Sequence, residues 1–274
     1  MITPSFGITA TERVLPSLTL DFMGASLDPR ITFTRAGATA TRVNASGNIE
    51  TVAADTPRFD YNPVTLALRG LLVEAGATNL VLQSQNFGTT WALTNATVAT
   101  GALSPNGSTN SDRIVETAVN SVHQAAQSSV PLTIGQTYRF SVYVKAAQRN
   151  WIAMQLSTGF TSTPGQYFNV STGALGTPAG NPAGRIEDAG NGWYRCSIQG
   201  VASATSGLVV IYLASANNTV VYLGDVNNGL SLWGAQVEIG SVETSYISTT
   251  TTSVVRNADS AVMTGANFTS VLTA

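Results

Sequence analysis

The residues that most often carry catalysis are rare in this chain. Among 274 residues there is one histidine, His123, and one cysteine, Cys196. A Ser-His-Asp triad would have to use His123, which stands in a segment, Asn120 to Ser128, typical of an exposed or half-buried strand. No Gly-x-Ser-x-Gly elbow accompanies it. Cys196 lies in the alternating run Trp193 to Ile198 and is interpreted as a small buried hydrophobe, because a nucleophile needs an activating base beside it.

Carboxylates offer two other kinds of chemistry. Glycoside hydrolysis needs two positioned carboxylates, but Glu187 and Asp188 are consecutive, would point to opposite faces of a strand, and are interpreted as turn charges. One histidine and one cysteine exclude a zinc cage, and no phosphate-binding glycine loop occurs. The sequence therefore predicts a protein that is not an enzyme and has no cofactor. A structural calcium ion stays open as an alternative, with three carboxylates to consider, otherwise interpreted as solvated turn or edge charges: Asp112, Asp225 and Glu238.

Aromatic residues beside amides suggest sugar binding, because a sugar ring stacks on an aromatic ring while polar side chains bond its hydroxyls. Trp151 follows a polar turn and has Arg149 and Asn150 beside it, which makes these three the first candidate ligand-binding group. Tyr167 with Gln166 is the second. Trp193 and Trp233, in strand-like runs among apolar residues, are assigned to the core. Tyr143, Tyr212 and Tyr222 could line a sheet face, but burial in the sheet is the preferred interpretation.

The composition favours strands over helices and narrows the possible partners. Only 10% of the residues are charged, against about 25% in a typical soluble domain, so Ser, Thr, Asn and Gly must cover the surface, and these suit strands and turns. The net charge is −2 with no basic cluster, so no nucleic acid is expected. No apolar run approaches the roughly 20 residues that span a bilayer, and Met1 to Pro4 does not begin like a signal peptide. Membrane insertion and standard export are not expected.

Strand-like runs separated by turn signals predict an all-β fold. From about Ser84 such runs recur in the pattern of a sandwich, most clearly over Tyr138 to Lys145. Before them, Ala40 to Asn44 and Asn48 to Val52 flank Gly47 and predict a hairpin. No segment has a sustained 3.6-residue apolar period, so helix should be minor.

Three regions follow from these patterns. Residues 1–80 are predicted to be a small β-rich assembly or attachment region with a thin core, which must lean on the sandwich or on a partner subunit. Residues 84–247 are predicted to form the sandwich. The Thr-rich stretch Ser248 to Thr252 opens the last region, 248–274, which is interpreted as a linker or an extended C-terminal arm able to pair with a neighbour's sheet edge.

Two sets of motifs resemble phage and prophage virion proteins. The first resembles the N-terminal region of tail-fibre-like or virion-associated proteins and comprises Leu27–Ala36, Pro57–Asp60, Gly70–Glu74 and Thr78–Leu80. The second is similar to the carbohydrate-binding-module-like jelly-roll domains of the same proteins and comprises Ser84–Phe87, Tyr138–Ala146, Tyr167–Gly173, Asp188–Cys196 and Leu232–Glu238. Together they cover roughly Leu18 to Asp259.

The resemblance implies a jelly-roll sandwich of two antiparallel sheets in a non-enzymatic fibre, adaptor or decoration protein. It implies a homotrimer or other symmetric oligomer that contacts other virion proteins and host surface polysaccharide. The implied location is the virion, with assembly in the host cytoplasm and exposure on the phage particle. Related modules often hold a structural calcium ion, but this chain has Gly229 to Trp233 where a ligating Asp is expected. The alternative function is a polysaccharide-binding module acting in host-cell adsorption.

Overall fold

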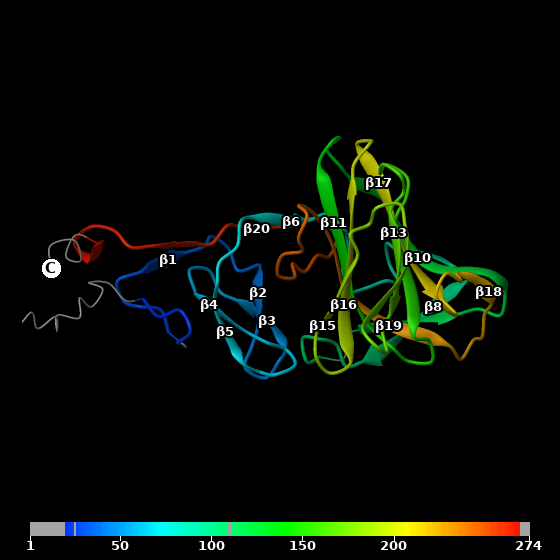
Figure 1. The fold of residues 1–274 in the computed structure, drawn as a ribbon, viewed down its shortest axis with the longest axis horizontal. Coiled ribbons are helices and arrows are strands. Elements are labelled where there is room, and N and C mark those ends of the chain that lie inside the picture. Colours follow the sequence, from blue (N-terminus) through cyan, green and yellow to red (C-terminus); the bar gives the residue numbers. More distant parts are fainter. Residues whose placement is uncertain (1–19, 25, 109–110, 269–274) are drawn as a thin grey trace, which may run out of the picture.

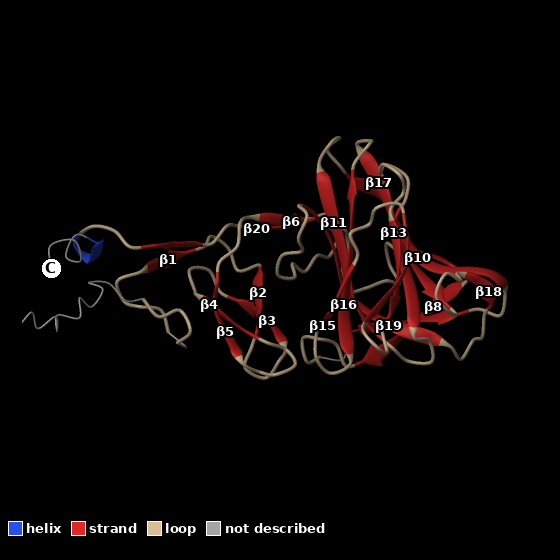
Figure 2. Ribbon diagram, viewed as in Figure 1, coloured by secondary structure: helices blue, strands red, loops and turns tan. Residues whose placement is uncertain are grey.

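The protein is built almost entirely of strands. A computed structural model describes residues 20–24, 26–108 and 111–268. Strand accounts for 49% and helix for 1%, which confirms the all-β prediction (Figure 2). In these ranges no helix is long and apolar enough to cross a membrane. Figure 1 shows a large sandwich beside a smaller strand-rich unit, which contains residues from both ends of the chain.

The first sheet of the sandwich has seven antiparallel strands. Their order is β14-β13-β12-β17-β10-β18, and β7 also pairs with β10. Because successive side chains of a strand point to opposite faces, Ile152 and Met154 enter the core while Trp151 and Gln155 lie on the outer face. The strands are β7 (Ala92–Thr94), β10 (Asn120–Pro131), β12 (Trp151–Leu156), β13 (Gly165–Asn169), β14 (Ala174–Ala179), β17 (Ser206–Ala214) and β18 (Val221–Leu223).

The second sheet has six antiparallel strands in the order β15-β16-β11-β19-β9-β8. Its centre is β11, the segment with the clearest alternation in the sequence, which pairs without interruption with one neighbour from Thr137 opposite Val201 to Lys145 opposite Trp193. The strands are β8 (Ala96–Ala102), β9 (Ser111–Glu116), β11 (Thr137–Lys145), β15 (Arg185–Asp188), β16 (Trp193–Val201) and β19 (Gly229–Ile239).

One apolar core fills the space between the two sheets. Phe168 and Ile211 of the first sheet and Phe140 and Cys196 of the second belong to it and are fully buried. Burial of each large apolar side chain of this kind contributes about 1.5–3 kcal/mol. The chain crosses repeatedly between the sheets, for example from β9 to β10 and on to β11. The structure thus confirms the predicted jelly-roll sandwich.

The small unit consists of four two-stranded pairs. β2–β3 is the predicted hairpin, with Gly47 at its turn at φ 78°, a left-handed conformation that glycine adopts at no steric cost. β4 pairs with β5, β6 with β20, and β1 with β21. The strands are β1 (Thr32–Thr34), β2 (Ala40–Val43), β3 (Ile49–Val52), β4 (Arg58–Tyr61), β5 (Leu68–Leu72), β6 (Ala77–Asn79), β20 (Val254–Arg256) and β21 (Ser260–Val262).

The C-terminal region, predicted to be a linker or an extended arm, forms strands that pair within its own chain. Residues 254–262 pair with N-terminal strands of the same chain, Val255 opposite Thr78 and Ala261 opposite Phe33. Each pairing satisfies backbone groups along one edge of the C-terminal strand. In Figure 1 the β1–β21 pair extends away from the sandwich. The segment is therefore part of the small unit as far as Val262, and residues 269–274 lie outside the described range.

Buried ion pairs connect the strands of the small unit. The Asp259 carboxylate contacts Arg58 and lies 3.2 Å from Nη1 of Arg35, and all three side chains have 0% exposure. Arg58 Nη1 is 2.9 Å from Oε2 of Glu74 and donates to the Thr41 carbonyl at 2.8 Å. These contacts hold the segments around β1, β4 and β5 to the segment between β20 and β21.

The small unit packs on the outer face of the second sheet through aromatic residues. Tyr143, Trp193 and Trp233 of the sheet form a cluster with Ile49 of β3 and with Tyr246. Trp193 and Trp233 are each 1% exposed, so their predicted burial is confirmed. They lie beneath the small unit rather than between the two sheets.

Acid should weaken the fold through Glu74, Glu116 and Glu243. Burial alone would raise the pKa of each carboxyl, but hydrogen bonds and neighbouring arginines outweigh it and hold all three pKa values below the ordinary 4.5. Such groups contribute stability that is fully present above the unfolded pKa and is lost as pH falls through the folded one. We expect the midpoint of thermal unfolding to be steady near neutrality and to fall below about pH 4.5. Calorimetry at pH 7, 5 and 3 checks this, and an unchanged midpoint at pH 3 would contradict it.

Candidate functional site

Three aromatic side chains lie together on the outer face of the first sheet. Tyr167 of β13 and Tyr212 of β17 both pair with Ala153 of β12, one from each side. Trp151 lies two residues earlier on β12, on the same face. All three are half-buried, so each ring keeps some surface exposed. We call Trp151, Tyr167 and Tyr212 the outer aromatic face.

Amide side chains border the outer aromatic face. The Tyr212 hydroxyl donates to Oε1 of Gln155 at 3.2 Å, and Gln124 of β10 pairs with Tyr212 on its other side. Burial raises the pKa of Tyr167 and of Tyr212, and the neighbouring Tyr167 raises that of Tyr212 further. Both hydroxyls therefore stay protonated at neutral pH. The face offers aromatic surface together with hydrogen-bond donors and acceptors.

A glycine makes room for Trp151. A Cβ added at Gly176 of β14 would lie 2.7 Å from Cζ3 of Trp151, 2.8 Å from Cβ of Tyr167 and 2.4 Å from Oδ1 of Asn217. Asn217, from the loop after β17, is held in turn by Thr177, whose N–H donates to its Oδ1 at 2.8 Å. The position of the Trp151 ring thus depends on a missing side chain and on a loop anchored to β14.

The structure separates the ligand-binding residues predicted from the sequence. It brings Trp151 and Tyr167 onto one face. Gln166 points the other way, is buried, and donates to the carbonyls of Tyr167 at 3.0 Å and Gly176 at 2.6 Å. Arg149 is held by Glu116, with Nε–Oε1 2.6 Å and Nη2–Oε2 2.9 Å. Asn150 is exposed at the start of β12 and accepts the Val170 N–H through its carbonyl. The side chains of Gln166 and Arg149 are therefore bonded within the protein, whereas the sequence predicted that they contact a ligand.

The sequence interpretation did not single out Tyr212 or Gln155 as ligand-binding residues. Tyr212 was assigned to the sheet interior, but the burial pattern of β17 alternates so that Val209, Ile211 and Leu213 face the core and Tyr212 faces outward. The alternation of Leu208 to Leu213 indicated that Tyr212 faces away from the core. It could not show that β17 lies next to β12.

His123 and Cys196 are enclosed by the sandwich. His123 was expected on an exposed or half-buried strand, but it is 0% exposed. Its Nδ1 is 2.7 Å from the Asn95 carbonyl, and its ring lies 4.8 Å from that of Tyr222. Cys196 is also 0% exposed, and burial raises its thiol pKa well above the ordinary value, which disfavours the reactive thiolate.

The carboxylates considered for a calcium site occupy different settings. Asp112 accepts the Phe87 N–H at 2.6 Å, and Glu238 is held by Gln236 and Thr244; both are buried, which corrects their interpretation as solvated charges. Asp225 caps a turn. Within the described ranges no group of three or more His, Cys, Asp or Glu side chains could hold a metal ion.

The adjacent acids Glu187 and Asp188 lie in a strand rather than in the predicted turn. Both belong to β15, opposite Arg195 and Tyr194 of β16. They border a cavity between the sandwich and the small unit.

Comparisons with known proteins find distantly similar solved structures and no family. No protein-family model and no curated protein matches the chain. Among solved structures, the enzymatically active domain of tailspike protein 4 of bacteriophage CBA120 aligns with a TM-score of 0.37 and 15% identity, covering 59% of this chain and 21% of that chain. A carbohydrate-binding module from Cellvibrio mixtus lichenase 5A in complex with cellotriose aligns at 0.33 and 12%, covering 63% and 100%. A xylan-binding domain from Paenibacillus barcinonensis aligns at 0.35 and 13%, covering 63% and 100%.

Proposed function

We propose that this chain is a non-enzymatic component of a phage virion that contacts host surface polysaccharide through its outer aromatic face. The observation that carries the proposal is the grouping of Trp151, Tyr167 and Tyr212 around Ala153, with the Gln155 amide beside them. Aromatic surface with a few placed polar groups is the composition of a sugar site. An open sheet face suits an extended polysaccharide better than a single ring.

The virion setting rests on the resemblance of the motif sets described above. In this setting the small unit attaches the sandwich to other virion proteins, and the chain assembles in the host cytoplasm as a homotrimer or another symmetric oligomer. It needs no cofactor. Electron microscopy of the phage particle, with the chain labelled by a specific antibody fragment, tests the location. A particle without label, together with a monomer by light scattering at micromolar concentration, would remove the virion role and leave a separate polysaccharide-binding module acting in adsorption.

Trp151→Ala should weaken polysaccharide binding. It should not unfold the protein, because the Trp151 side chain is only half-buried. Truncation of one aromatic anchor costs about 1–2 kcal/mol, or roughly 5- to 30-fold in Kd. A glycan array of host surface polysaccharides identifies the ligand, and titration calorimetry then compares the variants. Val255→Ala is a matched control, since Val255 is 54% exposed on the small unit. Binding that survives both Trp151→Ala and Tyr212→Ala unchanged would rule out this face.

Gly176→Ala tests the geometry while keeping every aromatic ring. The new Cβ cannot coexist with the ring of Trp151 at 2.7 Å, Oδ1 of Asn217 at 2.4 Å and Cβ of Tyr167 at 2.8 Å, so the ring, the loop and the edge strand β14 must shift relative to one another. We expect weaker polysaccharide binding, comparable with that of Trp151→Ala, and a thermal midpoint close to that of the unmodified protein. Full affinity in Gly176→Ala would show that the position of Trp151 does not matter.

A further inference from the structure

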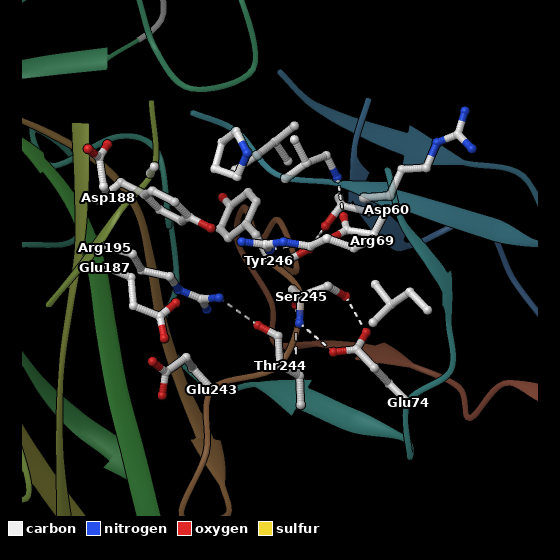
Figure 3. Close-up of a pocket in the computed structure, with 18 of the residues that line it drawn as sticks. Asp60, Arg69, Glu74, Glu187, Asp188, Arg195, Glu243, Thr244, Ser245 and Tyr246 are labelled. Atoms are coloured by element: carbon white, nitrogen blue, oxygen red, sulfur yellow. Dashed lines mark hydrogen bonds and ion pairs between the residues drawn. The ribbon is translucent and has the colours of Figure 1, made fainter. Parts of the chain in front are cut away.

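The cavity beside Glu187 and Asp188 lies where the small unit meets the second sheet of the sandwich. It has a volume of about 210 Å³ and is lined by residues of both parts. Figure 3 shows Glu187, Asp188 and Arg195 on one side and Asp60 and Arg69 on the other. We call it the junction cavity. It is separate from the outer aromatic face, which belongs to the first sheet.

Tyr143 brings an unsatisfied hydroxyl to the junction cavity. Tyr143 belongs to β11 and is 7% exposed. Its side chain lines the cavity. The ring is fixed by Trp233 at 5.4 Å, by Tyr246 at 6.3 Å, and by the Arg195 guanidinium at 5.3 Å. The hydroxyl makes no hydrogen bond to the described residues, so it is available to bond an occupant of the cavity.

Arg195 and the β15 carboxylates leave further hydrogen-bonding capacity. Arg195 is 8% exposed and donates to the Thr244 carbonyl at 2.8 Å and to the Ser141 hydroxyl at 3.0 Å, while its Nε has no partner among the described residues. Asp188 accepts the Gly190 N–H through Oδ1 only. The side chain of Glu187 makes no hydrogen bond or ion pair with the described residues. The wall thus presents both donors and acceptors.

This mixture selects against ions and in favour of hydroxyl groups. An anion would be repelled by Glu187 and Asp188, and a cation by Arg195 and Arg69, because like charges at short range disfavour binding. A hydroxyl can donate to a carboxylate and accept from a guanidinium or a phenol at the same time. With a volume of about 210 Å³, the cavity has room for several waters or for one six-membered sugar ring.

We propose that the junction cavity binds one sugar ring or a neutral polyol of similar size, with Tyr143, Glu187, Asp188 and Arg195 as its hydrogen-bonding groups. This site is independent of the proposed polysaccharide face. Since its walls come from both parts of the molecule, the occupant stabilises their packing against each other.

Titration of the full chain with D-glucose, D-galactose and N-acetylglucosamine tests the proposal. Amide chemical shifts of Ala189 and Ser245, which line the cavity, report binding there. We expect saturable shifts with at least one sugar at millimolar concentration. Tyr143→Phe should weaken this binding about fivefold, the equivalent of one hydrogen bond, without loss of stability, because the hydroxyl makes no bond within the protein. Glu187→Gln, on an exposed side chain, should act in the same direction.

Trp151→Ala separates the two sites. It should reduce polysaccharide binding at the outer aromatic face and leave the shifts of Ala189 and Ser245 unchanged. No saturable shift with any of the three sugars, or equal affinity in Tyr143→Phe, Glu187→Gln and the unmodified protein, would overturn the junction site. Neither result bears on the outer aromatic face, which is tested separately by the polysaccharide titration of its own variants.

Discussion

Asp259→Ala should lower the free energy of unfolding by about 3–5 kcal/mol, the usual cost of removing one partner from a buried ion pair. The Asp259 carboxylate, at 0% exposure, contacts both Arg35 and Arg58, which are also fully buried. Without it, two guanidinium groups lose their nearest negative charge in a region that water does not reach. Glu74 remains 2.9 Å from Arg58 but makes no ion pair with Arg35 within the described residues.

Asp259→Ala should also remove a hydrogen bond that joins two segments of the small unit. Oδ2 of Asp259 also accepts the Glu74 N–H at 2.9 Å, and the Asp259 N–H donates to the Glu74 carbonyl at 2.9 Å. Asp259 therefore joins the segment after β5 to the segment between β20 and β21. We expect the β1–β21 and β6–β20 pairs to open together when the carboxylate is removed.

Tryptophan fluorescence can follow this opening. Trp193 and Trp233 are buried beneath the small unit in contact with Ile49 and Tyr246, so detachment of the unit exposes them to water. Urea unfolding of Asp259→Ala should show an early fluorescence transition before the sandwich unfolds. Glu50→Gln is the matched control, because the Arg42–Glu50 pair is 28% and 37% exposed and such pairs contribute under about 1 kcal/mol. An Asp259→Ala curve no more displaced than that of Glu50→Gln would refute the account.

The sequence predicted the structure well where the signal was local. The hairpin around Gly47 could be predicted from its turn residue and two short strand-like runs. The long alternation of Tyr138 to Lys145 predicted the central strand β11. The C-terminal pairing could not be predicted in this way. β21 pairs with a strand more than 200 residues earlier in the chain. The sequence of its three residues does not indicate which strand it pairs with.

The candidate site shows the same limit. Alternation places Trp151 and Tyr167 on exposed positions of their own strands, but only the register of β12 with β13 and β17 shows that they share a face with Tyr212. Proximity in sequence did not reveal the contacts of Arg149. It precedes Trp151 by two residues, yet its guanidinium is directed to Glu116 of β9. An ion pair across 33 residues leaves no local trace.

Arg149→Ala should therefore destabilise the protein rather than weaken sugar binding. The guanidinium makes two hydrogen bonds to the fully buried Glu116 carboxylate and lies 4.9 Å from the ring of Tyr222. The variant leaves Glu116 with the Tyr222 hydroxyl at 2.7 Å and the Asp225 N–H at 3.0 Å, but removes its ion-pair partner. We expect a loss of about 3 kcal/mol, at the low end for a broken buried pair because Arg149 itself is 18% exposed.

The pH dependence of this loss distinguishes a missing charge from missing packing. In the unmodified protein, burial alone would raise the pKa of Glu116, but the hydrogen bonds from Arg149, Tyr222 and Asp225 outweigh it and hold the pKa below its ordinary value. Without Arg149 the burial effect should dominate and raise that pKa. A raised carboxyl pKa costs stability above it and costs less as the group is protonated. The difference between Arg149→Ala and the unmodified protein should therefore shrink from pH 7 to pH 4. Arg149→Lys, which keeps the charge but not the two-pronged contact, should fall between them. If Arg149→Ala instead keeps full stability and loses polysaccharide affinity, Arg149 is a sugar ligand, as its neighbourhood in the sequence indicated.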